Sequence, residues 1–203
     1  MCRFVDDGVY DKEAALFHLR CAAQLHILPA ILTLARMYAG MPHDLLSEVE
    51  PEGETEREKV IKAYSHFEEA AYMGDRASMV FVARALDTGK NLADPARKSA
   101  CLAMDWYEKI CEQDVEGGVG DTDGGFDDAR YLLLARMAEM YLGSGKANVD
   151  DWDLKRDPQR AGELFNEAAE AAMAAMKGKL ANKYYIYAEE AWAQVEEVEV
   201  EST

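Results

Sequence analysis

The sequence predicts an all-α fold, a short α-solenoid of helical hairpins joined by long acidic loops. Three observations favour this class. Apolar residues recur at the three- and four-residue spacing of helices over most of the chain. Proline, which interrupts helices, occurs only five times. Two kinds of segment also alternate along the chain, as expected when similar helical pairs stack on one another.

Length and charge narrow the class of protein further. The chain has 203 residues, with 22 Lys and Arg against 39 Asp and Glu and a formal net charge of −17. So acidic a chain repels phosphate, which argues against nucleic acid or an anionic membrane as partner. An apolar content of 49% is too high for a disordered tail, and no apolar run approaches a membrane span or a signal peptide.

The four cysteines, Cys2, Cys21, Cys101 and Cys111, have no metal-site spacing. Isolated cysteines on helical segments behave mostly as small buried hydrophobes. We therefore expect free thiols in a reducing compartment, most simply the cytoplasm.

The first repeated segment places an alanine four residues before a large apolar residue. The alanines are Ala15, Ala63, Ala103 and Ala161, and their partners are Leu19, Phe67, Tyr107 and Phe165. Residues four apart share one helix face, where a small residue lets a second helix approach and a large one fills the groove. This segment therefore predicts the first helix of each hairpin.

The second repeated segment centres on Leu-Ala-Arg or Val-Ala-Arg and ends in glycine. Its arginines are Arg36, Arg84 and Arg136, and its glycines are Gly40, Gly89 and Gly143. Glycine adopts the left-handed conformation that closes helices at little cost. The segment predicts the second helix of a hairpin and its end.

Together these patterns predict one domain over 1–203 with four hairpin units, at about 11–40, 56–89, 97–143 and 157–196. Acidic loops are expected at 41–55, 112–128 and 144–156, and a tail at 197–203. Asp157 followed by Pro158 has the form of a helix start, with an N-cap and a proline in the first turn.

Motifs for catalysis, cofactors or metals fail on inspection. Asp121 opens an EF-hand-like run, but Phe126 stands at the obligatory glycine and Leu132 at the obligatory glutamate. Gly118 and Gly120 lack the third glycine of a phosphate-binding loop. The histidines, His18, His26, His43 and His66, form no nucleophile–base set. The sequence thus predicts no enzyme, cofactor or metal site in this chain.

The last predicted helix, about 178–196, carries two apolar stripes rich in Tyr and Trp. They consist of Leu180, Tyr184, Tyr187 and Ala191, and of Ala181, Tyr185, Ala188, Trp192 and Val195. Terminal repeats need a polar outer face, and Tyr and Trp are enriched in binding hot spots. Either the stripes leave rings available to a partner, or both pack inward as a wide core face.

The helical pairs resemble SEL1-type repeats, relatives of tetratricopeptide repeats with irregular length. Two stretches narrow the resemblance: Gly74 to Gly89, and Lys155 to Gln194 with its runs Glu167-Ala168-Ala169 and Ala191-Trp192-Ala193. These stretches resemble the C-terminal SEL1-like repeat domain of the elongation factor 2 kinases, calmodulin-dependent members of the α-kinase family. The likeness extends over nearly the whole chain.

The resemblance implies a non-catalytic domain that docks elongation factor 2 and presents it to a calcium/calmodulin-dependent Ser/Thr kinase domain. The matching residues for substrate docking are Tyr184, Tyr185, Trp192, Glu196 and Glu197. Its alternative is an intramolecular domain that packs on its own kinase domain, with calmodulin bound there, and relays calmodulin binding without contacting substrate.

Two departures from the family pattern bear on docking. Val195 replaces a common methionine, and Val198 to Thr203 extend the chain beyond the glutamate pair that usually ends it. If a free carboxylate near Glu197 helps docking, this extension weakens it. Because a kinase domain, calmodulin-binding segment and ATP site are missing, we expect the chain to be a segment of a longer protein, with kinase activity in the parent.

Overall fold

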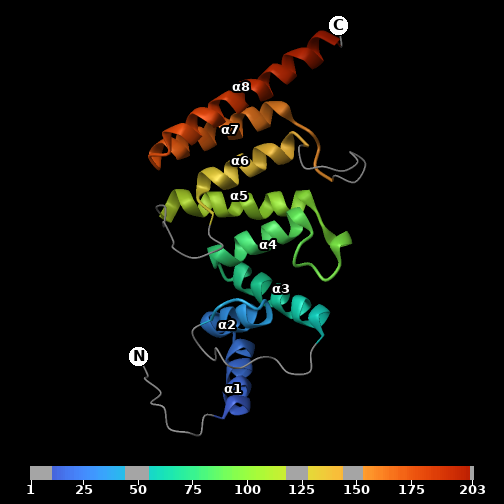
Figure 1. Ribbon diagram of the computed structural model, residues 1–203, viewed down its shortest axis with the longest axis vertical. Helices are drawn as coiled ribbons and strands as arrows, with labels where there is room; N and C mark the ends of the chain where they lie inside the picture. The colour runs from blue at the N-terminus through green and yellow to red at the C-terminus, as the bar shows by residue number, and fades with distance from the viewer. Residues whose placement is uncertain (1–10, 44–54, 118–127, 144–152, 202–203) are drawn as a thin grey trace. The chain divides into compact units, whose positions relative to one another are not determined.

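The computed structural model describes residues 11–43, 55–117, 128–143 and 153–201, with backbone alone at 114–117 and 196–201. The described residues form eight α-helices and one short 3₁₀ helix, and no strand. The helices are α1 (Lys12–Gln24), α2 (Leu28–Tyr38), α3 (Glu56–Tyr72), α4 (Arg76–Thr88), α5 (Ala100–Gly117), α6 (Arg130–Tyr141), α7 (Pro158–Ala174) and α8 (Gly178–Glu201), with the 3₁₀ helix at Pro95–Arg97 (Figure 1).

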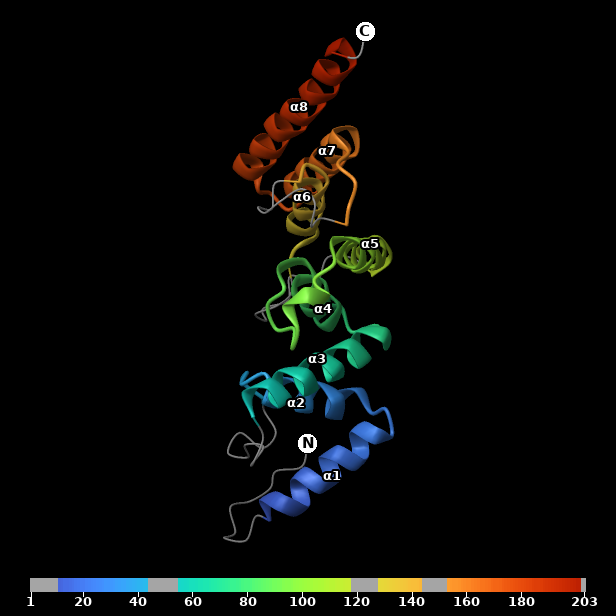
Figure 2. The ribbon, with the colours of Figure 1, turned by 90° about the vertical axis from the view of Figure 1, so that its right-hand side faces the viewer.

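Contacts divide the chain into two compact units. The first comprises Met1–Asp75 with Asn91–Ala93, and the second Arg76–Lys90 with Asp94–Thr203. In the first unit α2 packs on α1 and on α3, and in the second each helix from α4 to α8 packs on the next one. Figure 2 shows the second unit from another side. Consecutive stacking of this kind confirms the predicted α-solenoid, whereas the extent of a single domain over 1–203 stays a prediction.

The alanine pattern explains why the helices pack closely. Ala63, Ala103 and Ala161 are buried, as are the large partners of all three. A buried alanine brings two backbones together, and the large residue one turn later fills the groove beside it. In the first unit, the core cluster forms mainly around α2, with Ile31, Leu34, Met37 and Tyr38 among its members.

The predicted helix ends are confirmed where the chain turns. Gly40, Gly89 and Gly143 have φ angles of +66°, +75° and +70°, in the region that glycine enters without strain. At the start of α7, the Asp157 carboxylate accepts a hydrogen bond from the backbone N–H of Arg160 at 3.0 Å, and Pro158 occupies the first turn.

Two helices run further than the sequence indicates. Helix α5 extends to Gly117, so residues 112–117 are helical where a loop was expected. Helix α8 extends to Glu201, through most of the expected tail. Residues 112–116 contain Glu, Gln, Asp and Val, and residues 197–201 alternate Glu and Val. Acidic composition therefore did not disfavour helix here, because Glu and Gln are good helix formers. Most of the other predicted loop residues, and Asp121 to Phe126, lie outside the described residues.

Candidate functional site

The closing hairpin, α7 and α8, contains the aromatic residues that the sequence singles out. A tight turn at Ala175 to Lys177 joins the two helices, with Met176 at φ +58°. Seven residues of α7 are buried, because α6 packs on one side of it and α8 on the other. Helix α8 therefore packs against a helix that is itself largely buried.

Tyr184 belongs to the core of this hairpin. Its side chain is 7% exposed, and its ring stacks on Phe165 of α7 with centroids 6.4 Å apart. Burial raises the pKa of the Tyr184 phenol, as expected when the charged form loses water. Tyr187 also contacts Phe165, edge to face, at 5.5 Å.

Trp192 packs inward as well, against a glycine of α7. A Cβ placed on Gly162 would overlap the Trp192 indole, so the absence of a side chain at Gly162 makes room for the ring. The indole Nε1 is buried and has no hydrogen-bond partner in the part of the chain that the structure describes. Trp192 is only partly buried as a whole, but its ring serves chiefly to hold α8 against α7.

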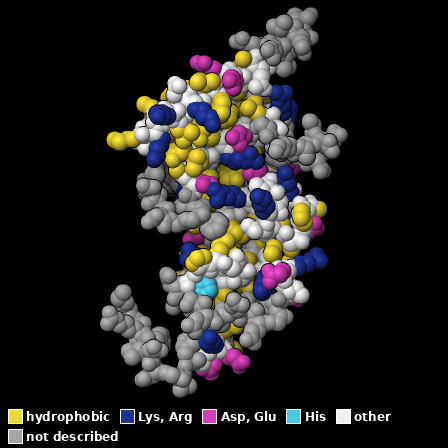
Figure 3. Space-filling model, viewed as in Figure 1, with side chains coloured by type: hydrophobic (Ala, Val, Ile, Leu, Met, Phe, Trp, Pro, Cys, Tyr) yellow, Lys and Arg dark blue, Asp and Glu magenta, His cyan; other side chains and the backbone are white. Residues whose placement is uncertain are grey.

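Tyr185 and Ile186 lie on the opposite, outward face of α8. Their side chains are 38% and 47% exposed, and Glu189 and Glu190 are exposed one turn later. Figure 3 shows that hydrophobic side chains lie beside Lys and Arg on the surface over α6 to α8. The structure therefore separates the predicted site residues: Tyr185 faces outward, Tyr184 and Trp192 pack inward, and the side chains of Glu196 and Glu197 lie outside the described residues.

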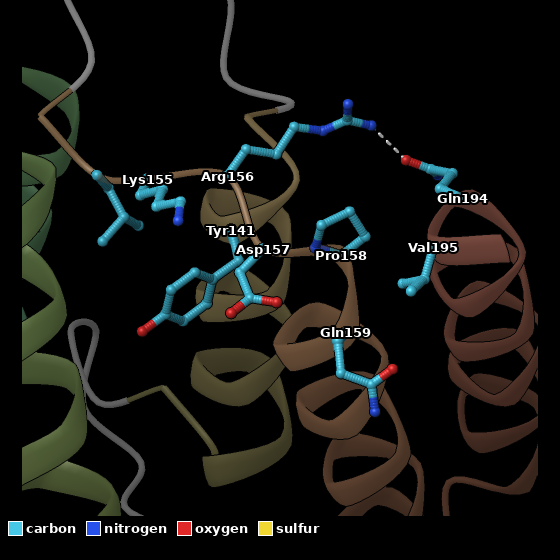
Figure 4. A pocket seen from close by; sticks show the side chains of 9 residues that line it. Tyr141, Lys155, Arg156, Asp157, Pro158, Gln159, Gln194 and Val195 are labelled. Carbon is cyan, nitrogen blue, oxygen red and sulfur yellow. Dashed lines mark hydrogen bonds between the residues drawn. The ribbon is translucent and has the colours of Figure 1, made fainter. Parts of the chain in front are cut away.

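A pocket of about 490 Å³ opens beside α8 at Gln194 and Val195. Its lining comes from Tyr141 at the end of α6, from the segment before α7, and from α8 (Figure 4). The lining residues are Tyr141, Leu154, Lys155, Arg156, Asp157, Pro158, Gln159, Gln194 and Val195. Sequence reasoning missed this pocket because it assigned 144–156 to an acidic loop. Two adjacent cations, Lys155 and Arg156, were the available signal.

Hydrogen bonds at several points fix the pocket segment. The Asp153 carboxylate accepts from the Ser99 hydroxyl at 2.5 Å and from the backbone N–H of Ala100 at 2.7 Å, at the start of α5. Four residues later, the backbone N–H of Asp157 donates to the carbonyl of Tyr141 at 2.9 Å. Arg156 then reaches α8, where its Nη2 donates to Gln194 Oε1 at 2.5 Å (Figure 4). These hydrogen bonds hold the pocket-lining segment in a defined position within the second unit.

A buried polar network lies elsewhere in the same unit. The Asp87 side chain, 3% exposed, receives two hydrogen bonds from the Arg136 guanidinium, at 2.7 and 2.8 Å. These bonds raise the pKa of Arg136, and Arg84 pairs with Asp128 nearby. Two of the three repeated arginines therefore tie α6 and the residues before it to α4, whereas Arg36 is exposed.

Metal ligands and cysteine thiols are two further kinds of functional group to locate among the described residues. No group of three or more His, Cys, Asp or Glu among them is placed to hold a metal ion. Cys21, Cys101 and Cys111 are free thiols, and burial with nearby Asp153 raises the pKa of Cys101, which opposes a reactive thiolate. The outward face of α8 and the pocket beside it are the candidate binding features of the closing hairpin.

Comparison with curated proteins gives a consistent result. The chain is 47% identical over 197 residues to eukaryotic elongation factor 2 kinase of Homo sapiens, matching 96% of this chain and 26% of that protein. It is 48% identical to the Rattus norvegicus kinase over 94% of this chain, and 40% identical to the Caenorhabditis elegans kinase over 89%. The chain spans about a quarter of the length of these relatives. No family model matches it.

Among solved structures, the chain aligns with a Sel1 repeat protein from Oxalobacter formigenes at 18% identity and a TM-score of 0.47, covering 89% of this chain and 64% of that one. It also aligns with a protective antigen of uropathogenic Escherichia coli displaying an SLR fold, at 20% identity and a TM-score of 0.43, covering 96% and 38%.

The resemblance that the sequence indicated is therefore confirmed at the level of whole-chain similarity. Between 89% and 96% of this chain aligns with the kinases at 40% to 48% identity. The chain is related, along nearly its whole length, to a quarter-length segment of eukaryotic elongation factor 2 kinase.

Proposed function

We propose that the chain is a non-catalytic, substrate-docking and regulatory domain of an elongation factor 2 kinase. In this role it presents elongation factor 2 to a calcium/calmodulin-dependent Ser/Thr kinase domain for threonine phosphorylation, and so acts in the control of translation elongation. The observation that carries the proposal is the match itself, which covers 96% of this chain and only 26% of the human kinase.

Docking would act through proximity. A substrate held by a tethered domain reaches the kinase at a raised local concentration, which converts a chance encounter into an intramolecular step. The net charge of −17 would steer a basic face of the factor toward the chain, an effect that weakens as salt rises.

Helix α8 supplies a suitable contact surface. Tyr185 and Ile186 form its exposed apolar part, and Tyr184 and Trp192 hold the helix in place from the other side. We assign contact with the factor to Tyr185, and a positioning role to Tyr184 and Trp192. Glu196 and Glu197 remain candidate contacts because they continue the same helix.

The test is retention of purified elongation factor 2 by the immobilised 203-residue chain. Tyr185→Ala combined with Ile186→Ala should reduce retention at least about tenfold, because removing a central aromatic contact costs about 2 kcal/mol or more. A matched control is Leu102→Ala with Leu132→Ala, whose side chains are 52% and 41% exposed elsewhere in the same unit. Equal loss in both variants, or no retention by the unmodified chain, would refute docking through this face.

An alternative has specific support from the same hairpin. Because Tyr184 and Trp192 pack inward, the aromatic stripes serve partly to build the domain. Such a domain would pack on its own kinase domain and relay calmodulin binding without touching substrate. Removing residues after Leu180 from a kinase that carries this segment separates the two roles. Docking predicts loss of activity on elongation factor 2 but not on a short peptide, whereas the intramolecular role predicts loss on both.

We also propose a cytoplasmic location, on the basis of the free cysteines. None of the helices described is long and apolar enough to cross a membrane.

A further inference from the structure

The pocket beside α8 holds two cations without an acidic partner among the described residues. Among the described residues, Lys155 makes no ion pair, and Arg156 donates one hydrogen bond, to the neutral Gln194. Both side chains are exposed, so their charges are accessible to an acidic ligand.

Three other arginines of the same unit behave differently. Arg84 pairs with Asp128, Arg136 with Asp87, and Arg160, only four residues after Arg156, with Glu163 at 2.9 Å. The hydrogen bond with Glu163 raises the pKa of Arg160. Each of these three arginines has an acidic partner, whereas Lys155 and Arg156 have none among the described residues, although the Asp157 carboxylate also lies in the pocket lining.

We propose that the pocket binds an extended acidic segment of a partner protein, with a carboxylate near Lys155 and Arg156 and an adjacent apolar side chain against Pro158 and Val195. This inference deepens the proposed function and rests on it for the source of the segment, the docked substrate, since Gln194 and Val195 belong to the helix proposed to dock it.

The lining matches such a segment in shape and chemistry. Leu154, Pro158 and Val195 provide apolar surface, and about 490 Å³ lies within the usual range of binding pockets, about 300–1,000 Å³. Tyr141 adds a phenolic hydroxyl, which is protonated at neutral pH as in any tyrosine, and burial raises its pKa further. Lys and Arg donate charge-assisted hydrogen bonds to carboxylates.

The charge of the pocket favours a carboxylate over a phosphate. Asp157 lies in the lining, and its carboxylate is held at the start of α7 by the Arg160 N–H. One negative charge therefore offsets part of the two positive charges. A singly charged carboxylate suits this balance better than a phosphate, which carries nearly two charges at pH 7.

A labelled peptide tests the proposal directly on the 203-residue chain. The probe is fluorescein-Gly-Asp-Leu-Glu-Phe-Gly amide, and its uncharged analogue carries Asn and Gln in place of Asp and Glu. Fluorescence anisotropy should show binding of the acidic probe at least about tenfold tighter than of the analogue, and weaker binding in higher salt. Equal affinities for the two peptides, no binding, or occupation of the pocket by acidic residues of the chain itself would overturn the proposal.

Two variants locate the site. Lys155→Glu with Arg156→Glu should weaken binding of the acidic probe at least about tenfold, because charge reversal replaces attraction by repulsion. The matched control is Lys177→Glu with Lys179→Glu, which makes the same charge change at the exposed start of α8 and should weaken binding less than about twofold. Lys155→Gln with Arg156→Gln, checked by circular dichroism, guards against a folding defect. A similar loss in the control would overturn a site at the pocket.

The two proposals fail in different ways. If elongation factor 2 is retained by the chain but the acidic probe is not bound, the proposed function stands and the pocket inference falls. If the probe binds at the pocket but the factor is not retained, the pocket binds acidic segments of another protein and the proposed function falls.

Discussion

The hairpin α1–α2 and the hairpin α7–α8 begin with the same alternation of small and large apolar residues, yet they differ in how much of it is buried. Helix α1 buries Ala23 alone, and its Phe17 is 63% exposed. Helix α7 buries seven residues. The difference follows from neighbours, because α7 packs on α6 and α8 whereas α1 packs on α2. The repeat pattern thus indicates a helix face that can be buried. Whether that face is buried depends on the helices that pack against it.

The largest expected difference between the hairpins is in the loss of stability when one aromatic side chain of each is replaced by alanine. Phe165 is 3% exposed and contacts the rings of Tyr184 and Tyr187. Phe165→Ala should lower the free energy of unfolding by about 3–5 kcal/mol, whereas Phe17→Ala should change it by less than about 0.5 kcal/mol. Urea unfolding followed by circular dichroism measures both. Similar losses would show that α1 is as well packed as α7.

A second test adds a methyl group instead of removing a ring. Gly162→Ala places a Cβ where the Trp192 indole lies, and the overlap should cost about 1–3 kcal/mol. Gly178→Ala is the matched control, because a Cβ there meets no atom within 4 Å and alanine favours helix. Opposite signs of the two changes in unfolding free energy are expected. A stable Gly162→Ala protein would mean that Trp192 is free to move, and would return it to the list of partner contacts.

The two hairpin turns allow a finer comparison, because each has a non-glycine residue with positive φ: His26 at +55° and Met176 at +58°. Met176→Gly should raise the free energy of unfolding by about 1 kcal/mol by relieving this backbone strain. His26→Gly should raise the free energy of unfolding by a smaller amount, because it loses the contact between His26 Nδ1 and Glu69 Oε1 at 2.7 Å. Thermal unfolding shows whether Met176→Gly stabilises the protein more than His26→Gly does. Met176→Ala keeps the backbone strain and should not raise the free energy of unfolding.

The smallest expected effect is a loss of stability at low pH that arises in the region of α1 to α3. All four histidines lie between residues 18 and 66. Burial lowers the pKa of His66 below its ordinary 6.5, so the folded state resists protonation. The contribution to stability is complete above pH 6.5 and decreases as the pH falls from there toward the lowered pKa.

Urea midpoints at pH 7.5 and 5.5 measure this effect. His66→Phe retains an aromatic ring to stack on Tyr38, now 5.9 Å from the histidine ring, but removes the titrating group. The variant should lose less stability on acidification than the unmodified chain. An identical loss in the two proteins would assign the acid sensitivity to other groups.

Much of the fold follows from local sequence signals. Gly40, Gly89 and Gly143 end helices with positive φ, and Asp157 caps α7, because each depends on neighbours along the chain. The ends of α5 and α8 were less predictable. Acidic residues there suggested solvated loops, but helix propensity kept residues 112–117 and 197–201 helical.

The candidate site was harder to predict because it depends on contacts distant in sequence. The apolar stripes of α8 cover more than half its circumference, so periodicity alone left open which rings point inward. Gly162, thirty residues before Trp192 in the chain, settles this by making space for the indole. The pocket likewise brings Arg156 to Gln194 across the whole hairpin, which no local pattern reveals.

The central claim, that α8 presents a surface to elongation factor 2 while its buried rings hold it in place, is tested most directly by amide hydrogen exchange of the chain with and without the purified factor. We predict slower exchange on binding at residues 185–195 of α8 and at 154–159 beside the pocket, with α1 and α2 unchanged. Protection elsewhere, with α8 and the pocket segment exchanging as in the free chain, would contradict the account.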